Sequence, residues 1–353
     1  MIFEQIAVGG CQSYLLGCAE RRAAVVIDPQ AHAIDRYASL LLREGLRLRY
    51  VIDTHTHADH FSGAHELAGR MGARVAAHRL SATPHADLRL EDGDQLMVGD
   101  TRLRVLHTPG HTLDSVCLLA SDRVFTGDTL LIGSTGRTDL PTGDPGALHD
   151  SLFGVLLKLD PALKVYPAHA YDGRSASTIG EEIASNPRLK HRDRAAFVDM
   201  MGRLNLSSPV HCTEALRVNT GGGKTIDQLV LDAAAIIAFV ASDALAARLE
   251  ADEPGLTLLD LRERDAFLAG HIPGARHLPR GELELRVNDE LTDPTARIVT
   301  CCEQGPAATL AAATLRTLGF QRVAALDGGM KDWRGRGLPI ELGAESFPTT
   351  VSR

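Results

Sequence analysis

The sequence predicts an α/β protein built from two units, and three features support this fold class. At 353 residues the chain is long enough for roughly two domains, each with its own core. Short, β-branched apolar runs alternate with helical periodicity over the first 200 residues. A second alternation of strands and helices begins near residue 228, after a stretch that is rich in proline, serine and glycine.

The first unit is predicted to contain a series of strands, several of which end in polar residues. The runs AAVVID (23–28) and YVIDT (50–54) are predicted as buried strands. Residues 33–45 between them are predicted as a helix that ends at Gly45. Residues 121–123 (SDR) are expected to form a hairpin turn. The strand series continues through 73–78, 101–108, 115–120, 123–128 and 164–169.

The second unit is predicted to be a mostly parallel sheet with helical connections. Its predicted strands are 256–262, 297–302 and 322–328, with a helix over 307–319 between the last two. The expected domain boundaries follow from these patterns. We expect a first domain at 1–204, a partly ordered connector at 205–227, a second domain at 228–345 and a tail at 346–353.

Composition and charge restrict the classes of function. The formal net charge of -8 argues against a dedicated nucleic-acid binder, and no apolar run approaches the ~20 residues that span a bilayer. No basic segment followed by an apolar one marks an export signal at the N-terminus. The six cysteines show no disulfide-framework spacing, so we expect reduced thiols and a cytoplasmic location.

The stretch VIDTHTHADHFSG (51–63) predicts a metal site after the second of these strands. It contains His55, His57, Asp59 and His60. In an extended backbone His55 and His57 point to the same side, so both can face one ion. Imidazole nitrogen and carboxylate oxygen together suit borderline divalent metals. The alternative is a solvated loop that happens to be rich in histidine.

Three further residues at strand ends favour the metal site over that alternative. His111 lies in HTPGHT, Asp128 in FTGDTLL and His169 in YPAHAYDG, and each follows a β run and a turn residue. Loops at one edge of a rigid sheet can bring such residues together. Each of them taken singly would more often be structural, but together they indicate one site.

These motifs, in this order, resemble the metallo-β-lactamase superfamily over about residues 1–200. HTHADH is followed by TPGHT, by the aspartate of TGDTL and by PAH. The resemblance implies an αββα sandwich with the metal at one edge of the two sheets. The superfamily consists mostly of two-zinc hydrolases, including the glyoxalase II thioesterases, so the fold alone does not settle the reaction.

Two strings point to one branch, the persulfide dioxygenases. They are GDTLLIGSTGRTDLPTGD, which contains Arg137, and PAHAYDGRSAST, which contains Tyr171. The resemblance implies one Fe(II) per chain, held by His55, His111 and Asp128. Two histidines and one carboxylate are the ligands that non-haem Fe(II) oxygenases use. The implied reaction is oxidation of glutathione persulfide by O2 to sulfite and glutathione.

The remaining residues receive supporting roles. We expect Arg137 to clamp a glutathione carboxylate and Tyr171 to donate a hydrogen bond to the substrate. The alternatives are a surface arginine and a half-buried tyrosine. The other members of the cluster are expected to orient the ligands by hydrogen bonds or to be the remnant of a second metal site. They are His57, Asp59, His60 and His169.

The second unit resembles the rhodanese domains. LLDLRERDAFLAGHIPGARHLP (258–279) and LDGGMKDWRGRGLPI (326–340) resemble their two signature stretches, and CCEQGPAATLAAATLRTLGF occupies the place of the active loop. The resemblance makes Cys302 the sulfur-carrying nucleophile and Cys301 a core residue. The alternative for Cys302 is an inert buried thiol. The family's loop usually carries an arginine where this chain has Ala307, and Glu303 adds a negative charge, so thiosulfate affinity is in question.

The leading hypothesis is an iron persulfide dioxygenase joined to a rhodanese sulfurtransferase. Its partners would be glutathione persulfide, glutathione, O2 and thiosulfate or sulfite, with no nucleic acid or membrane; a homodimer is compatible with the sequence. A second hypothesis is a two-zinc thioester hydrolase of glyoxalase II type, in which Asp128 bridges the ions and Asp59, His60 and His169 bind the second. In a third, the C-terminal unit is a binding module that does not turn over.

Overall fold

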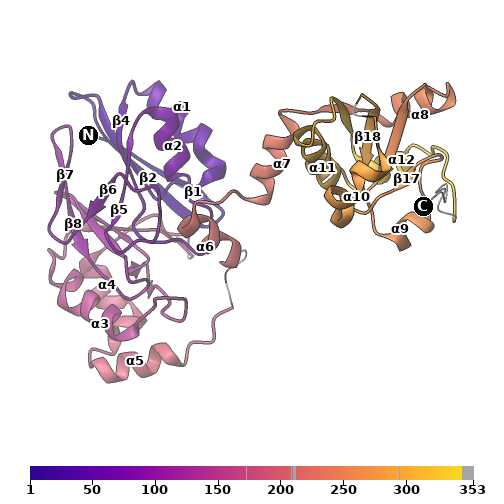
Figure 1. The fold of residues 1–353 in the computed structure, drawn as a ribbon. Helices are drawn as coiled ribbons and strands as arrows, with labels where there is room; N and C mark the ends of the chain where they lie inside the picture. Colours follow the sequence, from indigo (N-terminus) through magenta and orange to yellow (C-terminus); the bar gives the residue numbers. More distant parts are fainter. Residues whose placement is uncertain (172, 208, 210–211, 294, 344–353) are drawn as a thin grey trace. The chain divides into compact units, whose positions relative to one another are not determined.

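The structure of the chain is a computed structural model, and it describes residues 1–171, 173–207, 209, 212–293 and 295–343. The chain divides between Gly223 and Lys224 into two compact units (Figure 1). The predicted tail, 346–353, lies outside the described residues. The predicted boundaries at 204, 228 and 345 stay a prediction, although most of the predicted connector belongs to the first unit.

The first unit contains two six-stranded sheets among the described residues. One sheet has the order β1-β2-β3-β4-β5-β6, and the other has the order β14-β13-β10-β9-β8-β7. The strands of the first sheet are β1 (Ile2–Val8), β2 (Cys11–Cys18), β3 (Ala23–Ile27), β4 (Arg47–Ile52), β5 (Arg74–His78) and β6 (Leu88–Leu90). Those of the second are β7 (Gln95–Val98), β8 (Thr101–His107), β9 (Val116–Leu119), β10 (Arg123–Gly127), β13 (Lys164–Pro167) and β14 (Ser177–Thr178), and β11 (Leu130–Leu131) and β12 (Ser134–Thr135) pair separately.

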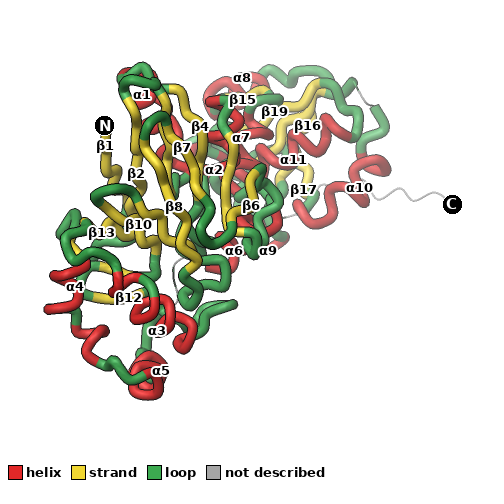
Figure 2. Tube along the Cα trace, turned by 90° about the vertical axis from the view of Figure 1, so that its left-hand side faces the viewer, coloured by secondary structure: helices red, strands yellow, loops and turns green. Residues whose placement is uncertain are grey.

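Helices cover the outer face of each sheet. They are α1 (Ile34–Arg43), α2 (Ala64–Met71), α3 (Pro145–Gly154), α4 (Ile179–Ser185) and α5 (Arg194–Gly202); a further helix of this unit, α6 (Cys212–Gly221), does not belong to these layers. Apolar side chains of α1 and α2 pack on the first sheet, and those of α3, α4 and α5 pack on the second. In Figure 2 α3, α4 and α5 lie below β10 and β13, at the lower end of the view.

A separate apolar cluster fills the space between the two sheets. Tyr14 and Val25 of the first sheet meet Val105 and Phe125 of the second in this cluster. Alternate residues of each strand therefore face two different cores, as a sheet that is covered on both sides requires. The order of layers is helix, sheet, sheet, helix, and the predicted αββα sandwich is confirmed.

In the part of the second unit that the structure describes, five strands form a sheet of order β15-β19-β18-β16-β17, in which every neighbouring pair is parallel. Its strands are β15 (Ala238–Val240), β16 (Leu256–Asp260), β17 (Arg276–His277), β18 (Arg297–Cys301) and β19 (Arg322–Leu326). Its helices are α7 (Ile226–Ala234), α8 (Ser242–Glu250), α9 (Arg264–Leu268), α10 (Leu283–Glu290), α11 (Pro306–Thr317) and α12 (Gly329–Gly335). The predicted parallel α/β unit is confirmed. Among the described residues, no helix is both long and apolar enough to cross a membrane.

Truncation of a core leucine tests the packing of the second unit. Leu315 of α11 is fully buried, so Leu315→Ala should lower the free energy of unfolding by about 2–5 kcal/mol. The single tryptophan, Trp333, is buried in a cluster on the other face of the sheet, so its fluorescence in urea reports on the unit as a whole. Leu285→Ala, at a side chain that is 82% exposed, is the control. A loss below about 1 kcal/mol for Leu315→Ala would contradict this packing.

Candidate metal centre and sulfur-transfer loop

The candidate metal centre is formed by loops that follow strands of both sheets of the first unit. The loop between β4 and α2 carries His55, and the loop after β8 carries His111. Asp128 directly follows β10, and His169 follows β13, which pairs with β10 in parallel. The structure therefore brings together residues from four predicted strand ends.

His55 is held with one ring nitrogen ready for a metal. The hydroxyl of Thr54 donates to the Asp28 carboxylate (2.9 Å), so its oxygen accepts a hydrogen bond from Nδ1–H of His55 (3.0 Å). Nε2 of His55 is buried and has no hydrogen-bond partner among the described residues. Burial lowers the pKa of His55 to about 3, which keeps the ring neutral. A neutral imidazole with a bare nitrogen is a metal ligand.

His111 is fixed in the same tautomer by a different group. Its Nδ1 donates to the backbone carbonyl of Arg137 (2.8 Å). Its Nε2 therefore has a free lone pair, and this atom lies 3.6 Å from Oδ2 of Asp128. Burial alone would raise the pKa of Asp128, but His169 and His111 hold this pKa well below its usual range. The carboxylate is therefore ionised, as a metal ligand must be.

His55, His111 and Asp128 form one group of potential ligands. One ligand atom of each lies within 4.8 Å of the others, and all three residues are buried. An orphaned imidazole nitrogen, a second imidazole in the right tautomer and an ionised carboxylate fit a metal such as Fe(II), which accepts two histidines and one carboxylate.

Two glycines let the backbone approach this group closely. Gly127 has a φ of +50°, and a Cβ there would lie 2.6 Å from Oγ1 of Thr54. A Cβ on Gly136 would lie only 1.9 Å from the carbonyl oxygen of Asp128. Any side chain at these positions would displace a ligand or the hydroxyl that orients one.

His169 lies between two carboxylates. Its Nδ1 contacts Oδ1 of Asp128 (2.7 Å), and its Nε2 contacts Oδ2 of Asp59 (2.8 Å). Burial opposes the charged ring, but Asp128 and Asp59 raise the pKa of His169 well above its ordinary value. The protonated ring donates both hydrogens and so fixes the orientation of the Asp128 carboxylate. Asp59 also accepts from Nδ1 of His60 (3.2 Å) and from the thiol of Cys11 (3.3 Å).

His57 lies outside the His55 group and belongs to a third cluster. Its Nε2 is 3.2 Å from Oδ1 of Asp28 and 3.9 Å from Oδ1 of Asp53. Burial raises the pKa of Asp53 to about 6. Asp28 thus supports both His57 and, through Thr54, His55. Sequence reasoning missed Asp28, although it ends a buried run (AAVVID) just as Asp128 ends the strand RVFTGD.

Sequence reasoning also missed Asn219, which lies on α6 within the predicted connector. Its amide nitrogen donates to the carbonyl oxygens of His57 (2.8 Å) and His60 (2.9 Å). Its side-chain oxygen accepts from the backbone nitrogen of Ser62 (3.0 Å). One side chain therefore holds three backbone groups of the histidine loop. No periodicity signals this role, because it depends on contacts between segments about 160 residues apart.

The two predicted substrate-binding residues differ in their surroundings. The Arg137 guanidinium pairs with both oxygens of Asp139 (2.6 and 2.8 Å) and donates to the carbonyl of Ser207 (2.7 Å). A substrate carboxylate would have to share or replace these partners. Tyr171 is exposed, and its ring lies parallel to that of His169 with the centroids 5.6 Å apart. Their roles in binding substrate stay predictions.

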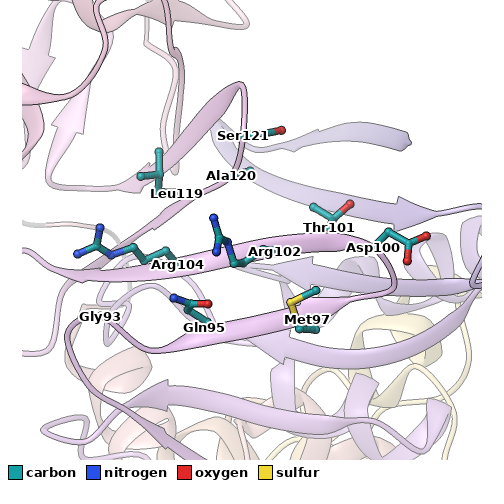
Figure 3. Close-up of a pocket in the computed structure, with 10 residues that line it drawn as sticks. All are labelled: Gly93, Gln95, Met97, Asp100, Thr101, Arg102, Arg104, Leu119, Ala120 and Ser121. Atoms are coloured by element: carbon teal, nitrogen blue, oxygen red, sulfur yellow. The ribbon is translucent and has the colours of Figure 1, made fainter.

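A hollow of about 950 Å³ lies on the second sheet of this unit, along β7, β8 and β9. Figure 3 shows Arg102 and Arg104 of β8 among the side chains that line it. None of the predicted site residues lines this hollow. It is therefore separate from the candidate metal centre.

Cys302 lies at the start of a loop that leads from β18 into α11. Its Sγ accepts hydrogen bonds from the backbone nitrogens of Gly305 (3.2 Å) and Ala308 (3.3 Å). Backbone donors at the N-terminus of a helix stabilise negative charge on sulfur. Cys301 is buried inside the sheet, and burial raises the pKa of its thiol well above the ordinary value. The geometry suits Cys302, rather than Cys301, as the nucleophile.

Comparison with known proteins defines the class of each unit. Residues 6–169 match the metallo-beta-lactamase superfamily, and residues 242–336 match the rhodanese-like domain. The chain is thus a metallo-β-lactamase-fold protein that carries a rhodanese-like domain.

More specific relatives share the first unit. The chain is 40% identical over 210 residues to the mitochondrial persulfide dioxygenase ETHE1 of Homo sapiens, which covers 59% of this chain and 82% of the relative. The crystal structure of ETHE1 from Myxococcus xanthus is 39% identical, covers 64% of this chain and 100% of that one, and superposes with a TM-score of 0.62. A hydroxyacylglutathione hydrolase of Francisella tularensis is 36% identical over 155 residues, 43% of this chain and 60% of the relative.

The chain belongs to the family of the ETHE1 persulfide dioxygenases and has a rhodanese-like domain in addition. This membership and the added domain support a role in sulfur metabolism, with sulfur-containing substrates such as persulfides and thiosulfate. Family and fold also imply a metal, and the structure contains candidate ligand groups.

Substitution of Asn219 tests its hold on the histidine loop. Asn219→Ala leaves three backbone groups without their partner, so it should destabilise the first unit by about 1–3 kcal/mol and reduce the metal retained per chain. Thermal unfolding by circular dichroism and elemental analysis measure the two effects. Arg217→Ala, at an exposed residue of the same helix, is the control. Equal metal content in both variants would show that Asn219 does not support the loop.

Proposed function

We propose that the first unit catalyses the Fe(II)-dependent oxidation of glutathione persulfide by O2 to sulfite and glutathione. The observation that carries this proposal is the convergence of His55, His111 and Asp128, with both imidazoles in the tautomer that leaves Nε2 free. Similarity to the ETHE1 persulfide dioxygenases supports the choice of reaction. We propose one iron per chain and a cytoplasmic location; a homodimer stays a prediction.

The overall reaction balances without a further reductant. One glutathione persulfide, one O2 and one water give glutathione, sulfite and two protons. Iron, when bound, supplies the activation of dioxygen beside a soft, anionic sulfur. The protein supplies position and charge: the His169 ring holds the Asp128 carboxylate, and Arg137 and Tyr171 are proposed to bind the glutathione part.

We further propose that the second unit transfers sulfur between thiosulfate and glutathione through Cys302. The Cys302 thiolate attacks the outer sulfur of thiosulfate, the S–S bond breaks, and sulfite leaves with the electron pair. Glutathione then takes the sulfur from the Cys302 persulfide and becomes glutathione persulfide, and the thiolate is regenerated. The backbone donors of Gly305 and Ala308 support the charged sulfur in both steps. The product is the substrate proposed for the first unit.

A second candidate function is a two-zinc thioester hydrolase with a rhodanese-like module that only binds. Two observations favour it. Cys11, Asp59 and His60 form a further group whose ligand atoms lie within 4.8 Å of one another, and Nε2 of His60 is buried without a partner among the described residues. In addition, this chain is 36% identical over 155 residues to a hydroxyacylglutathione hydrolase, whose name is that of a thioester hydrolase. Metal content separates the candidates, because the dioxygenase needs one iron and the hydrolase two zincs.

Removal of one ligand tests the dioxygenase. The purified chain should contain close to one iron and should consume O2 when glutathione persulfide is added. His55→Ala should lower both iron content and O2 uptake by more than tenfold, because one of three protein ligands is lost. His65→Ala removes a histidine of α2 that lies outside the ligand group and should change neither. Two zincs per active chain, with thioester hydrolysis and no O2 uptake, would contradict the proposal.

Substitution of the second cysteine of the pair tests the sulfurtransferase. Cys302→Ser should abolish sulfur transfer from thiosulfate to glutathione, because the hydroxyl cannot carry a persulfide, and should leave O2 uptake largely intact. Cys301→Ala removes the neighbouring buried thiol and should retain transfer. Mass spectrometry of the wild type should show one added sulfur on Cys302 after thiosulfate treatment. Equal loss of both activities in a folded Cys302→Ser chain would contradict separate sites.

A further inference from the structure

The loop that carries Cys302 is surrounded by charges that cancel. The carboxylate of Glu303, the next residue, binds the guanidinium of Arg334 on α12, and its other oxygen lies 3.4 Å from Nη1 of Arg262. Both guanidinium groups also act on the neighbouring Cys301 thiol, where they oppose the burial that raises its pKa. Glu303 therefore contacts two cationic side chains beside the loop.

Arg262 is already committed to a second carboxylate. It makes a two-pronged ion pair with the buried Asp260 (2.6 and 3.0 Å) and also donates to the carbonyl of Gly270 (2.8 Å). Arg262 is buried, whereas Arg334 and Glu303 are each a little under half exposed. Two positive charges thus face two negative charges, and only the exposed Glu303–Arg334 pair can rearrange at low cost.

The loop itself offers no positive side chain. Residues 302–308 read CEQGPAA, so its anion-binding groups are uncharged: the backbone N–H groups and the side-chain amide of Gln304. The loop is also fixed: the carbonyls of Cys302 and Glu303 accept hydrogen bonds from the backbone nitrogens of Met330 and Lys331 (2.9 Å each). A Cβ on Gly329 would lie 2.4 Å from the carbonyl oxygen of Cys302, so α12 approaches the loop as closely as its backbone allows. Glu303 therefore cannot move away as part of a flexible loop.

We propose that Glu303 is a specificity-determining residue, which occupies Arg334 and so makes Cys302 prefer organic persulfides and thiols over thiosulfate and sulfite. This inference rests on the sulfur transfer proposed for Cys302. Thiosulfate brings two negative charges to the loop, and sulfite leaves with two. An organic persulfide brings at most one charge on its sulfur. A site whose charges cancel lacks the electrostatic attraction that would favour binding of an anion. This loss weakens binding of the dianion thiosulfate more than binding of a persulfide with one charge.

Both donors give the same protein product by a balanced step. With thiosulfate, the Cys302 thiolate takes the outer sulfur, and the electron pair of the broken S–S bond leaves on sulfite. With an organic persulfide, the thiolate takes the terminal sulfur, and the electron pair leaves on the thiolate of the donor. Neither step needs an oxidant or reductant, so Glu303 selects between donors without altering the chemistry.

The experiment compares steady-state transfer, in the absence of O2, to isotope-labelled glutathione with thiosulfate or unlabelled glutathione persulfide as donor, and labelled glutathione persulfide is the product measured in both cases. Glu303→Gln removes the charge and keeps the shape, so Arg334 becomes free to bind an anion. We expect the KM for thiosulfate to fall about fivefold, the effect of losing one partly exposed ion pair. The KM for glutathione persulfide should change less than twofold. Arg334→Gln added to Glu303→Gln should return the KM for thiosulfate to about the wild-type value.

Two controls keep the outcomes distinct. Glu284→Gln removes an exposed glutamate of α10 and should change neither KM. Glu303→Asp keeps the charge and should keep the wild-type preference between the two donors. It serves as the second variant if Glu303→Gln fails to fold. An equal change in both KM values, or no change in either, would overturn the role of Glu303. Absence of a Cys302 persulfide with both donors in every variant would instead overturn the sulfur transfer itself.

Discussion

The carboxylate of Asp28 is the interaction on which the candidate metal centre depends. It accepts hydrogen bonds from the backbone nitrogen and the hydroxyl of Thr54 (2.7 and 2.9 Å) and contacts His57. Asp28 is buried, and its φ of +49° is unfavourable for a residue with a side chain. The fold accepts this backbone strain because the carboxylate fixes the start of the histidine loop. Thr54 then sets the tautomer of His55, and the tautomer exposes the nitrogen that can bind a metal.

The fold was largely predictable because both units follow simple periodic patterns. Buried strands such as β3 and β10 are short apolar runs, and α1 has a clear apolar stripe and ends at Arg43, two residues before Gly45, where φ is +62°. The pairing of the strands into two stacked sheets came from the family resemblance. It could not come from periodicity, since apolar runs do not state which strands are neighbours.

In the candidate site, sequence analysis could predict only those residues whose side-chain type by itself suggests metal binding. Histidines and aspartates after strands drew attention to His55, His111 and Asp128, and the structure places them together. The groups that orient the two histidines are a threonine and the backbone carbonyl of Arg137, and an asparagine on α6 holds the loop that follows His55. Arg137 shows the difference most clearly. The sequence suggested a role for the side chain of Arg137, whereas in the structure its backbone carbonyl also orients His111. Every residue has a backbone carbonyl, so residue type cannot predict such a role.

The contact of α6 with the histidine loop has a consequence for how such two-part enzymes can be recombined. The match to the metallo-beta-lactamase superfamily ends at residue 169, but Asn219 closes the loop from 50 residues further along. If the chain were joined to a different second domain at any point before Asn219, the new protein would therefore lack a residue that supports the candidate metal centre. Gene fusion or laboratory shuffling can replace the rhodanese-like partner freely only at the four residues, 222–225, that separate α6 from α7.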